Sequence, residues 1–303
     1  MDIYLPIVGE SQSVVILLIL GGAVGFLSGL FGVGGGWLMT PLLIFIGIPP
    51  IFAVAASANQ LVGSSVTGAL AQWRRGNIDL QMGLVMLAGG LVGSVLGVWL
   101  FAALRRVGQI EIAINFAYIV MLGSLGAFML FESGRAILFR APAARRKLHR
   151  HGWIHRLPLK MRFRRSKLYI SAIAPAAVGL AGGFLSGVLG VGGGFLMVPA
   201  MIYVLDMPTA LVPGTSLFQI IFVAASVTIL QSVENGTVDI VLAMILLLGG
   251  VVGVQVGLRV GTHLRGEYFR ALLGVLVVAA AAKLAADLTI TPHDLYSLEL
   301  RMP

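Results

Sequence analysis

The sequence predicts an all-α, polytopic membrane protein made of two sequence-related halves with about four spans each. Hydrophobic residues make up 58% of the 303 residues, and Asp, Glu, Lys and Arg together make up only 11%. The mean hydropathy is +0.98. Soluble domains usually carry about 25% charged residues, so a soluble chain of this length would have too few charges for its surface. A bilayer removes that demand, because lipid tails are themselves apolar.

Apolar runs between charged residues, glycines and prolines give the expected spans. In the first half they are 14–30, 37–46, 51–73, 80–102 and 110–131, and in the second 172–188, 195–205, 210–232, 240–260 and 269–286. A helix needs about 20 residues to cross the hydrocarbon core, so the second run of each half is too short to cross alone. We therefore expect the first span of each half to be broken at a Gly-rich segment.

The two halves repeat one another. The segment from Gly25 to Pro41 recurs with few changes from Gly183 to Pro199. Further equivalent pairs are Gln60 and Gln219, Gln72 and Gln231, Asp79 and Asp239, and the glycines 89, 93 and 97 with 249, 253 and 257. An even number of spans per half makes such repeats parallel and an odd number inverts them, so four spans predict parallel repeats.

Positive charge is concentrated in one linker. More than half of the 21 Lys and Arg residues lie between Arg135 and Lys167, and the positive-inside rule predicts that this segment is cytoplasmic. The expected organisation is a first transmembrane repeat (11–131), a basic linker (132–169), a second repeat (170–287) and a C-terminal tail (288–303). Because the basic residues lie between hydrophobic blocks, we expect contact with membrane lipid rather than nucleic acid, in a multi-pass protein of a prokaryotic inner membrane.

The ionisable residues argue against catalysis within the membrane. The chain has no cysteine, and its histidines and carboxylates fall in the linker, in the tail or near expected span ends. An intramembrane hydrolase or metal site needs such groups clustered inside the spans. We therefore expect no enzyme activity, no metal and no cofactor, and a core without carboxylates suits anions better than cations.

The glycine clusters, Gly32–Gly36 and Gly190–Gly194, are the most informative feature of the sequence. Four glycines in five positions cannot be expected to hold a regular helix. Non-helical backbone at membrane depth is tolerated where it is buried in protein or lines a cavity. The short helix that follows would present free N–H groups and the positive end of its dipole, which together can bind an anion. A tight reversal or a close helix contact explains the glycines equally well.

Polar residues lie inside the second long run of each half. Polar residues that lie three apart in these runs share a helical face, and buried polar groups need hydrogen-bond partners in a bilayer. Either they line a hydrogen-bonding pathway or they bond between helices. Together with the glycines they make up the expected anion site: Gly34, Gly35, Gly36, Ser57, Asn59, Gln60, Gly192, Gly193, Gly194, Thr215, Ser216 and Gln219.

The paired Gly-Val-Gly-Gly-Gly segments, each followed at similar spacing by Pro41 or Pro199, resemble the sulfite exporter TauE/SafE family, also called the 4-toluene sulfonate uptake permease family. The segment from Pro213 to Leu217 is similar to that family's second-half pattern, and the first half departs from it at the matching place. The resemblance covers nearly the whole chain outside the linker. It implies transport of sulfite, organosulfonates or related sulfur-containing anions, without fixing the substrate or the direction.

We therefore expect a secondary transporter of small anions, with its site near the midplane between the halves. Two other classes stay open. The chain could be a non-transporting membrane scaffold or accessory subunit, or, with less support from its residues, an intramembrane enzyme acting on lipid or quinone.

Overall fold

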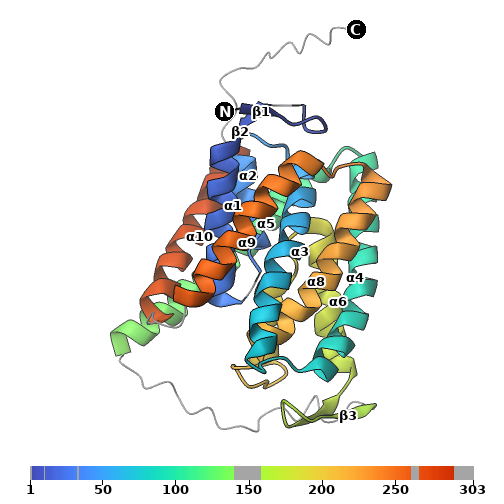
Figure 1. The fold of residues 1–303 in the computed structure, drawn as a ribbon, viewed down its shortest axis with the longest axis vertical. Coiled ribbons are helices and arrows are strands. Elements are labelled where there is room, and N and C mark those ends of the chain that lie inside the picture. Colours follow the sequence, from blue (N-terminus) through green and yellow to red (C-terminus); the bar gives the residue numbers. More distant parts are fainter. Residues whose placement is uncertain (1, 10, 33, 140–157, 261–265, 290–303) are drawn as a thin grey trace. The chain divides into compact units, whose positions relative to one another are not determined.

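The computed structural model describes residues 2–9, 11–32, 34–139, 158–260 and 266–289. The first repeat contains β1 (Asp2–Tyr4), β2 (Ser11–Ser13), α1 (Val14–Phe31), α2 (Gly36–Phe45), α3 (Pro50–Arg74), α4 (Leu80–Arg106) and α5 (Ile110–Phe139). The second contains β3 (Lys160–Phe163), β4 (Leu168–Ser171), α6 (Ile173–Leu189), α7 (Gly194–Tyr203), α8 (Val212–Leu230), a π-helical turn η2 (Gln231–Asn235), α9 (Ile240–Val260) and α10 (Gly266–Thr289). The all-α fold class is confirmed (Figure 1). Most of the basic linker and of the C-terminal tail lies outside the described residues.

Several helices can cross a membrane by length and composition. They are Leu80–Arg106, Ile110–Phe131, Val212–Asn235 and Ile240–Val260. Their outer faces remain apolar, as α9 illustrates with Met244, Leu248 and Val252, whose side chains are 53%, 57% and 64% exposed. Exposed apolar patches of this kind mark contact with another apolar phase, so the multi-pass membrane assignment is confirmed.

The chain forms two compact units, and each is described by itself. The first contains Met1–Ile114 and Ala141–Arg265, and the second contains Asn115–Arg140 and Gly266–Pro303. In the second unit α5 and α10 are antiparallel, because Gly126 lies beside Val278 and Leu130 lies beside Gly274. The helix seams and the candidate site described below lie in the first unit.

The chain reverses at the predicted break. Helix α1 ends at Phe31 and α2 begins at Gly36, so the Gly-rich break is confirmed. The side-chain Nε2 of Gln12, just before α1, donates to the carbonyl oxygen of Ile46, just after α2, at 3.2 Å. Helix α2 therefore returns to the end where α1 begins. The pair α1–α2 is a helical hairpin, where we expected one discontinuous span.

The two repeats run in opposite directions. The Ile7 N–H, in the β1–β2 hairpin, donates to Asp239 Oδ2 at the start of α9 (2.8 Å). The Ser166 N–H, in the β3–β4 hairpin, donates to Asp79 Oδ2 at the start of α4 (3.0 Å). Helix α3 joins the two ends, and Figure 1 shows β1–β2 at the top and β3 at the bottom. We call these the N-terminal end and the linker end.

This arrangement corrects the expectation of parallel repeats. A helical hairpin returns the chain to the end where it began, so α1 and α2 together contribute no net crossing. The second repeat therefore starts at the opposite end of the unit and is inverted relative to the first. Inversion could not be read from the apolar runs, because run length does not say whether the chain continues or turns back at a glycine.

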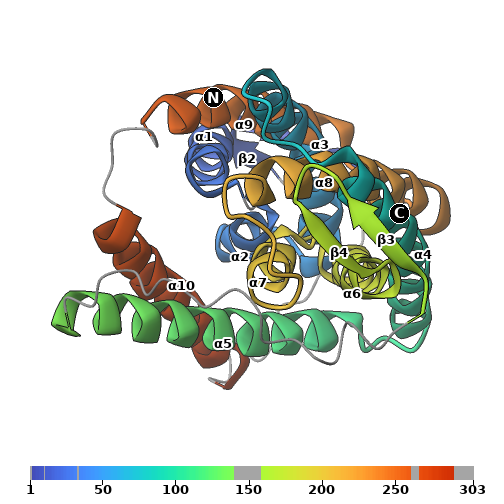
Figure 2. The ribbon, with the colours of Figure 1, turned by 90° about the horizontal axis from the view of Figure 1, so that it is seen from below.

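Two parallel helix pairs join the repeats, α1 with α9 and α6 with α4 (Figures 1 and 2). Glycines allow backbones to touch at both seams. A methyl group on Gly25 would overlap the Gly250 carbonyl, and one on Gly183 would overlap the Gly90 carbonyl. Small residues permit this close approach between membrane helices. The repeated glycines of α4 and α9 make the same kind of contact, with Gly89, Gly93 and Gly97 against α6 backbone and Gly249, Gly253 and Gly257 against α1 backbone.

Asp79 and Asp239, each 1% exposed, cap α4 and α9. Asp79 Oδ1 accepts from the Met82 N–H (3.2 Å) and Asp239 Oδ1 accepts from the Leu242 N–H (3.2 Å). Carboxylates suit this place because the first N–H groups of a helix have no partner inside the helix. Each aspartate therefore serves two purposes, since its other oxygen holds a β-hairpin over the same end of the unit.

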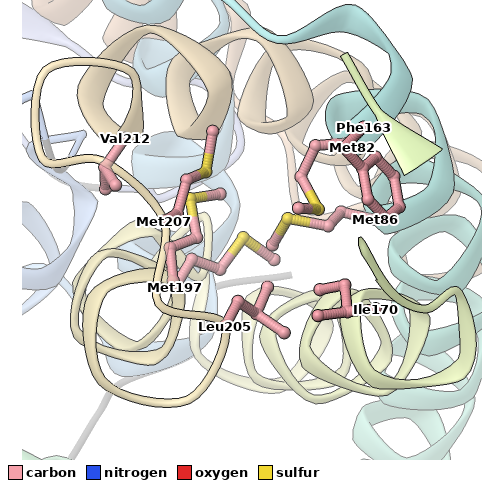
Figure 3. Packing of buried hydrophobic residues seen from close by; sticks show 9 residues of the cluster. Met82, Met86, Phe163, Ile170, Met197, Leu205, Met207 and Val212 are labelled. Atoms are coloured by element: carbon pink, nitrogen blue, oxygen red, sulfur yellow. The ribbon is translucent and has the colours of Figure 1, made fainter. Parts of the chain in front are cut away.

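The β3–β4 hairpin closes the linker end over a methionine-rich core (Figure 3). Phe163 and Ile170 of the hairpin are buried among residues from α4, α7, the α7–α8 connection and the start of α8: Met82, Met86, Met197, Met201, Leu205, Met207 and Val212. At the N-terminal end the equivalents of Met82, Met86 and Met201 are the buried leucines Leu242, Leu246 and Leu43. The unbranched thioether side chain adapts to irregular space, so the two caps differ in chemistry.

Opposite exposure of the two hairpins gives a direct test of inversion. The chain has no cysteine, and Tyr4 and Tyr169 are 61% and 58% exposed at the two ends. In intact cells an impermeant maleimide should label Tyr4→Cys, and should label Tyr169→Cys only after permeabilisation, because the basic residues lie mainly at the linker end. Labelling of both variants from the same side would contradict the inverted arrangement.

The backbone contacts at the seams predict that alanine lowers thermal stability at a seam glycine but not at a glycine outside the seams. Gly183→Ala places its methyl on the Gly90 carbonyl, whereas a methyl on Gly123 of α5 meets nothing within 4 Å. Gly183→Ala should lower the melting temperature of the purified protein by several degrees, and Gly123→Ala should leave it nearly unchanged. Equal melting temperatures for the two variants would show that α6 and α4 do not touch through backbone.

Candidate solute-binding site

Each glycine segment ends one helix and starts another inside the first unit. The Gly32 N–H donates to the Ser28 carbonyl and the Gly190 N–H donates to the Ser186 carbonyl, both at 2.8 Å. The two glycines have φ of 64° and 70°, the left-handed conformation that commonly ends a helix. The chain then turns, and α2 and α7 begin at the last glycine of each segment.

The starts of α2 and α7 have no side-chain caps. At α2 the first turn closes where the Leu38 N–H donates to the Gly35 carbonyl (3.1 Å), and at α7 where the Leu196 N–H donates to the Gly193 carbonyl (3.1 Å). N–H groups earlier in the chain have no acceptor within these turns. Each start therefore offers backbone donors and the positive end of a helix dipole.

The two starts converge on one pair of apolar side chains, Leu61 and Ile220. A methyl group on Gly34 would lie 3.1 Å from Leu61 Cδ2 and 3.3 Å from Ile220 Cδ1. One on Gly192 would lie 2.7 Å from Leu61 Cδ1 and 3.2 Å from Ile220 Cγ2. Leu61 lies near the middle of α3 and Ile220 near the middle of α8. The glycine segments of both repeats therefore meet at mid-depth, as the anion-site hypothesis requires.

Three of the expected site hydroxyls are engaged with protein partners. Ser57 Oγ lies 2.6 Å from Thr40 Oγ1 and donates to its own helix. Ser216 Oγ donates to the Gly32 carbonyl (3.0 Å). Thr215 Oγ1 accepts from the Asp79 N–H (3.0 Å) at the linker end. These hydroxyls join α3 and α8 to neighbouring elements, which is the structural alternative considered for them.

Gln60 and Gln219 differ from these hydroxyls, because some of their polar atoms have no hydrogen-bond partner. Gln60 and Gln219 are fully buried, and each amide lies against a seam glycine of the other repeat. A methyl group on Gly250 would lie 2.5 Å from Gln60 Nε2, and one on Gly90 would lie 2.5 Å from Gln219 Nε2. Both side-chain atoms of Gln60 and Oε1 of Gln219 have no hydrogen-bond partner. Asn59, by contrast, is half-buried on another face of α3.

Two further serines were missed by the sequence prediction. Ser28 and Ser186 occupy equivalent places in α1 and α6, and each is buried with an unpartnered Oγ. Their recurrence within the repeated Gly25–Pro41 segment was the available signal. A serine among helical glycines is also typical of helix packing, so sequence alone did not separate the two roles.

The four helices that flank the glycine segments carry no charged side chain. The sequences of α1, α2, α6 and α7 contain no Asp, Glu, Lys, Arg or His. Among the residues that the structure describes, no group of His, Asp and Glu could hold a metal ion. The available donors are thus backbone N–H, hydroxyl and carboxamide groups, which can bind an anion at a helix N-terminus.

Inverted repeats with short helices that begin at mid-depth are typical of many polytopic membrane transporters. The family model "Sulfite exporter TauE/SafE" matches residues 17–284. The chain belongs to this family, and the family and its relatives' names indicate a membrane transporter of the TauE/SafE type.

The relatives come from bacteria, an archaeon and a plant. A "Probable membrane transporter protein" of Xylella fastidiosa (strain 9a5c) is 29% identical over 274 residues, which cover 89% of this chain and 94% of the relative. "Probable membrane transporter protein YjnA" of Bacillus subtilis is 28% identical, with coverage of 88% and 98%. "Sulfite exporter TauE/SafE family protein 1" of Arabidopsis thaliana is 31% identical over 145 residues, 45% of this chain and 32% of the relative. No solved structure matches.

Because Gly192 lies against Leu61, a methyl group added at Gly192 should clash with Leu61, and shortening Leu61 should relieve that clash. Gly192 and Gly108 have nearly equal φ, 73° and 74°, but a methyl on Gly108 meets nothing within 4 Å. Gly108→Ala should cost about 1–2 kcal/mol of stability through its left-handed backbone alone. Gly192→Ala should cost more, and Leu61→Ala should remove the excess. A double-mutant cycle on thermal unfolding measures this coupling, and additive effects would show that Leu61 does not touch Gly192.

Proposed function

We propose that this chain is a secondary transporter of small sulfur-containing oxyanions, such as sulfite or organosulfonates. The observation that carries the proposal is the meeting of two uncapped helix N-termini, from α2 and α7, at mid-depth beside Leu61 and Ile220. An anion bound there would receive backbone N–H donors from both repeats at once. The membership of the chain in the TauE/SafE family supports the choice of sulfur oxyanions.

Neutral donors suit a transported anion. Lys or Arg beside the path would bind an anion more tightly but would also slow its release. Helix dipoles and amide groups provide a weaker attraction, equivalent to about half a charge at each helix start. Gln60 and Gln219 each add a buried carboxamide oxygen without a partner, while Gln219 Nε2 donates to the Met86 carbonyl at 3.4 Å. A site of this kind can bind an anion and then release it.

The inverted repeats give a route to alternating access. Two oppositely oriented repeats can exchange conformations, so that the site opens first to one side and then to the other. In the structure Leu61 and Ile220 pack against both glycine segments. Their side chains must shift for a solute to contact both starts, which makes this apolar pair the expected barrier between solute and donors.

Export needs no coupling ion on energetic grounds. An inside-negative potential favours outward movement of an anion by about 2.3 kcal/mol per net charge per 100 mV. Uptake against the same potential would require a coupled cation. Direction therefore depends on coupling, and we propose the uncoupled export mode as the simplest use of this site.

Flux measurements test the proposal against a scaffold role. Purified protein in liposomes should carry sulfite down its gradient, and Gln60→Glu and Gln219→Glu should each reduce that flux about tenfold or more, because like charges placed in contact cost several kcal/mol. Gln72→Glu is the matched control, since Gln72 lies at the end of α3 and accepts from Asn77 (3.2 Å). Absence of flux for every small oxyanion would favour the scaffold, and unchanged flux in both glutamine variants would place the path elsewhere.

A further inference from the structure

Unpartnered polar atoms recur at equivalent positions of the two repeats. Oγ of Ser28 and Ser186, and Oε1 of Gln60 and Gln219, are buried without a hydrogen-bond partner. Burying a polar group without a partner costs about 1–3 kcal/mol. Such a cost at one residue is an isolated defect. Its repetition on α1 and α3 and again on α6 and α8 indicates groups kept free for a ligand.

The hydroxyls of Ser28 and Ser186 differ from those of Ser64 and Ser94, and unlike the unpartnered Ser65 and Thr228 hydroxyls they lie at equivalent positions of the two repeats. Ser64 Oγ donates to the Leu61 carbonyl (3.2 Å) and Ser94 Oγ donates to the Leu91 carbonyl (2.8 Å). This bond to the preceding turn is the ordinary solution in a membrane helix. Ser28 and Ser186 form no such bond, so their hydroxyls remain available to a partner outside their own helix.

The faces that carry these serines are those that pack on the glycine segments. Ser28 lies one turn after Val24, and a methyl on Gly35 would overlap Val24. In the second repeat Ser186 lies one turn after Gly182, and a methyl on Gly193 would lie 2.5 Å from the Gly182 carbonyl. Residues four apart share a helical face. Each free hydroxyl therefore lies on the side of its helix that faces a start of α2 or α7.

The glutamines lie one turn from residues that contact the same segments. Gln219 follows Ser216, which donates to the Gly32 carbonyl. Gln60 follows Ser57, which is bonded to Thr40 of α2. Gln60 and Gln219 therefore lie one helical turn from residues that contact α2 and the first glycine segment.

We propose that Ser28, Gln60, Ser186 and Gln219 bind the solute together with the two helix starts, and that this set selects a monoanion retaining a proton over a dianion. This inference rests on the proposed transport function, and it assigns the protonation state of the solute that the site takes.

The positive charge at the two helix starts favours a monoanion over a dianion. Each helix start is equivalent to roughly +0.5 charge, so two starts supply about one positive charge in total. The helices that carry the glycine segments add no cationic side chain. A monoanion is balanced by this arrangement. A dianion would leave a second buried negative charge without a partner, which is strongly unfavourable.

The hydrogen-bond donors and acceptors of the four side chains favour an oxyanion that carries one O–H group. Gln60 and Gln219 both present a free Oε1, and a carboxamide oxygen can only accept. A fully deprotonated oxyanion also only accepts, so its oxygens would face these oxygens without a hydrogen between them. An oxyanion with one O–H group donates to a glutamine oxygen and accepts from the serine hydroxyls and backbone N–H groups. It satisfies both kinds of unpaired atom.

Binding of three oxyanions to the purified protein separates charge from protonation. Sulfite changes from monoanion to dianion within the accessible pH range, methanesulfonate stays a monoanion without an O–H group, and sulfate stays a dianion. Sulfite affinity should fall about tenfold or more as pH rises through its own ionisation, because loss of the donated hydrogen leaves buried groups unpaired. Methanesulfonate affinity should change little over the same range, and sulfate should bind weakest at every pH.

Variants assign the effect to the named residues. Ser28→Ala combined with Ser186→Ala should weaken sulfite binding at low pH about thirtyfold, since two hydrogen bonds to the solute are lost. Gln60→Met combined with Gln219→Met should flatten the pH dependence of sulfite toward that of methanesulfonate. Ser64→Ala is the control, because its buried hydroxyl is already bonded within α3, and it should bind like the parent protein.

The outcomes distinguish this inference from the proposed function. Sulfate bound as tightly as sulfite, or serine variants that behave like Ser64→Ala, would overturn the selection of a protonated monoanion while anion transport stands. Absence of binding and of flux for all three oxyanions would overturn both.

Discussion

Irregular backbone inside a membrane must be enclosed by protein, and this constraint organises the whole first unit. Each glycine segment interrupts the hydrogen-bond ladder at mid-depth, where lipid offers no partner. The fold encloses both segments with one set of contacts. Seam glycines bring α1 onto α9 and α6 onto α4, while α3 and α8 place Leu61 and Ile220 against the segments. The uncapped starts of α2 and α7 are consequently shielded from lipid.

Polar groups in the unit divide into two functions that residue type alone does not reveal. Asp79 and Asp239 lie at the ends, where they cap helices and hold β-hairpins. Ser57 and Ser216 look like pathway residues in the sequence, yet they join α3 and α8 to neighbouring elements. Gln60 and Gln219, by contrast, each keep a buried carboxamide oxygen without a partner. A carboxamide offers a donor and an acceptor at once, which a serine bonded to its own helix does not.

Much of this could be predicted from the sequence, because apolar runs and a repeated glycine motif are local signals. The helices, the break before Gly36 and the equivalence of Gln60 with Gln219 all follow from such patterns. The reversal at the break does not, since glycine permits either a kink or a turn. The β-hairpins escaped prediction because their strands are three or four residues long. Their stability comes from Asp79, Asp239 and buried side chains distant in sequence.

The central claim is that both repeats bind one oxyanion through the starts of α2 and α7. Diffraction from crystals grown with a selenium oxyanion, recorded at the selenium edge, tests it most directly. The account predicts an anomalous peak within hydrogen-bonding distance of backbone N–H groups in both glycine segments, with Leu61 and Ile220 displaced from between them. A peak confined to one segment, or found at the arginines of the linker end with the glycine segments unoccupied, would contradict it.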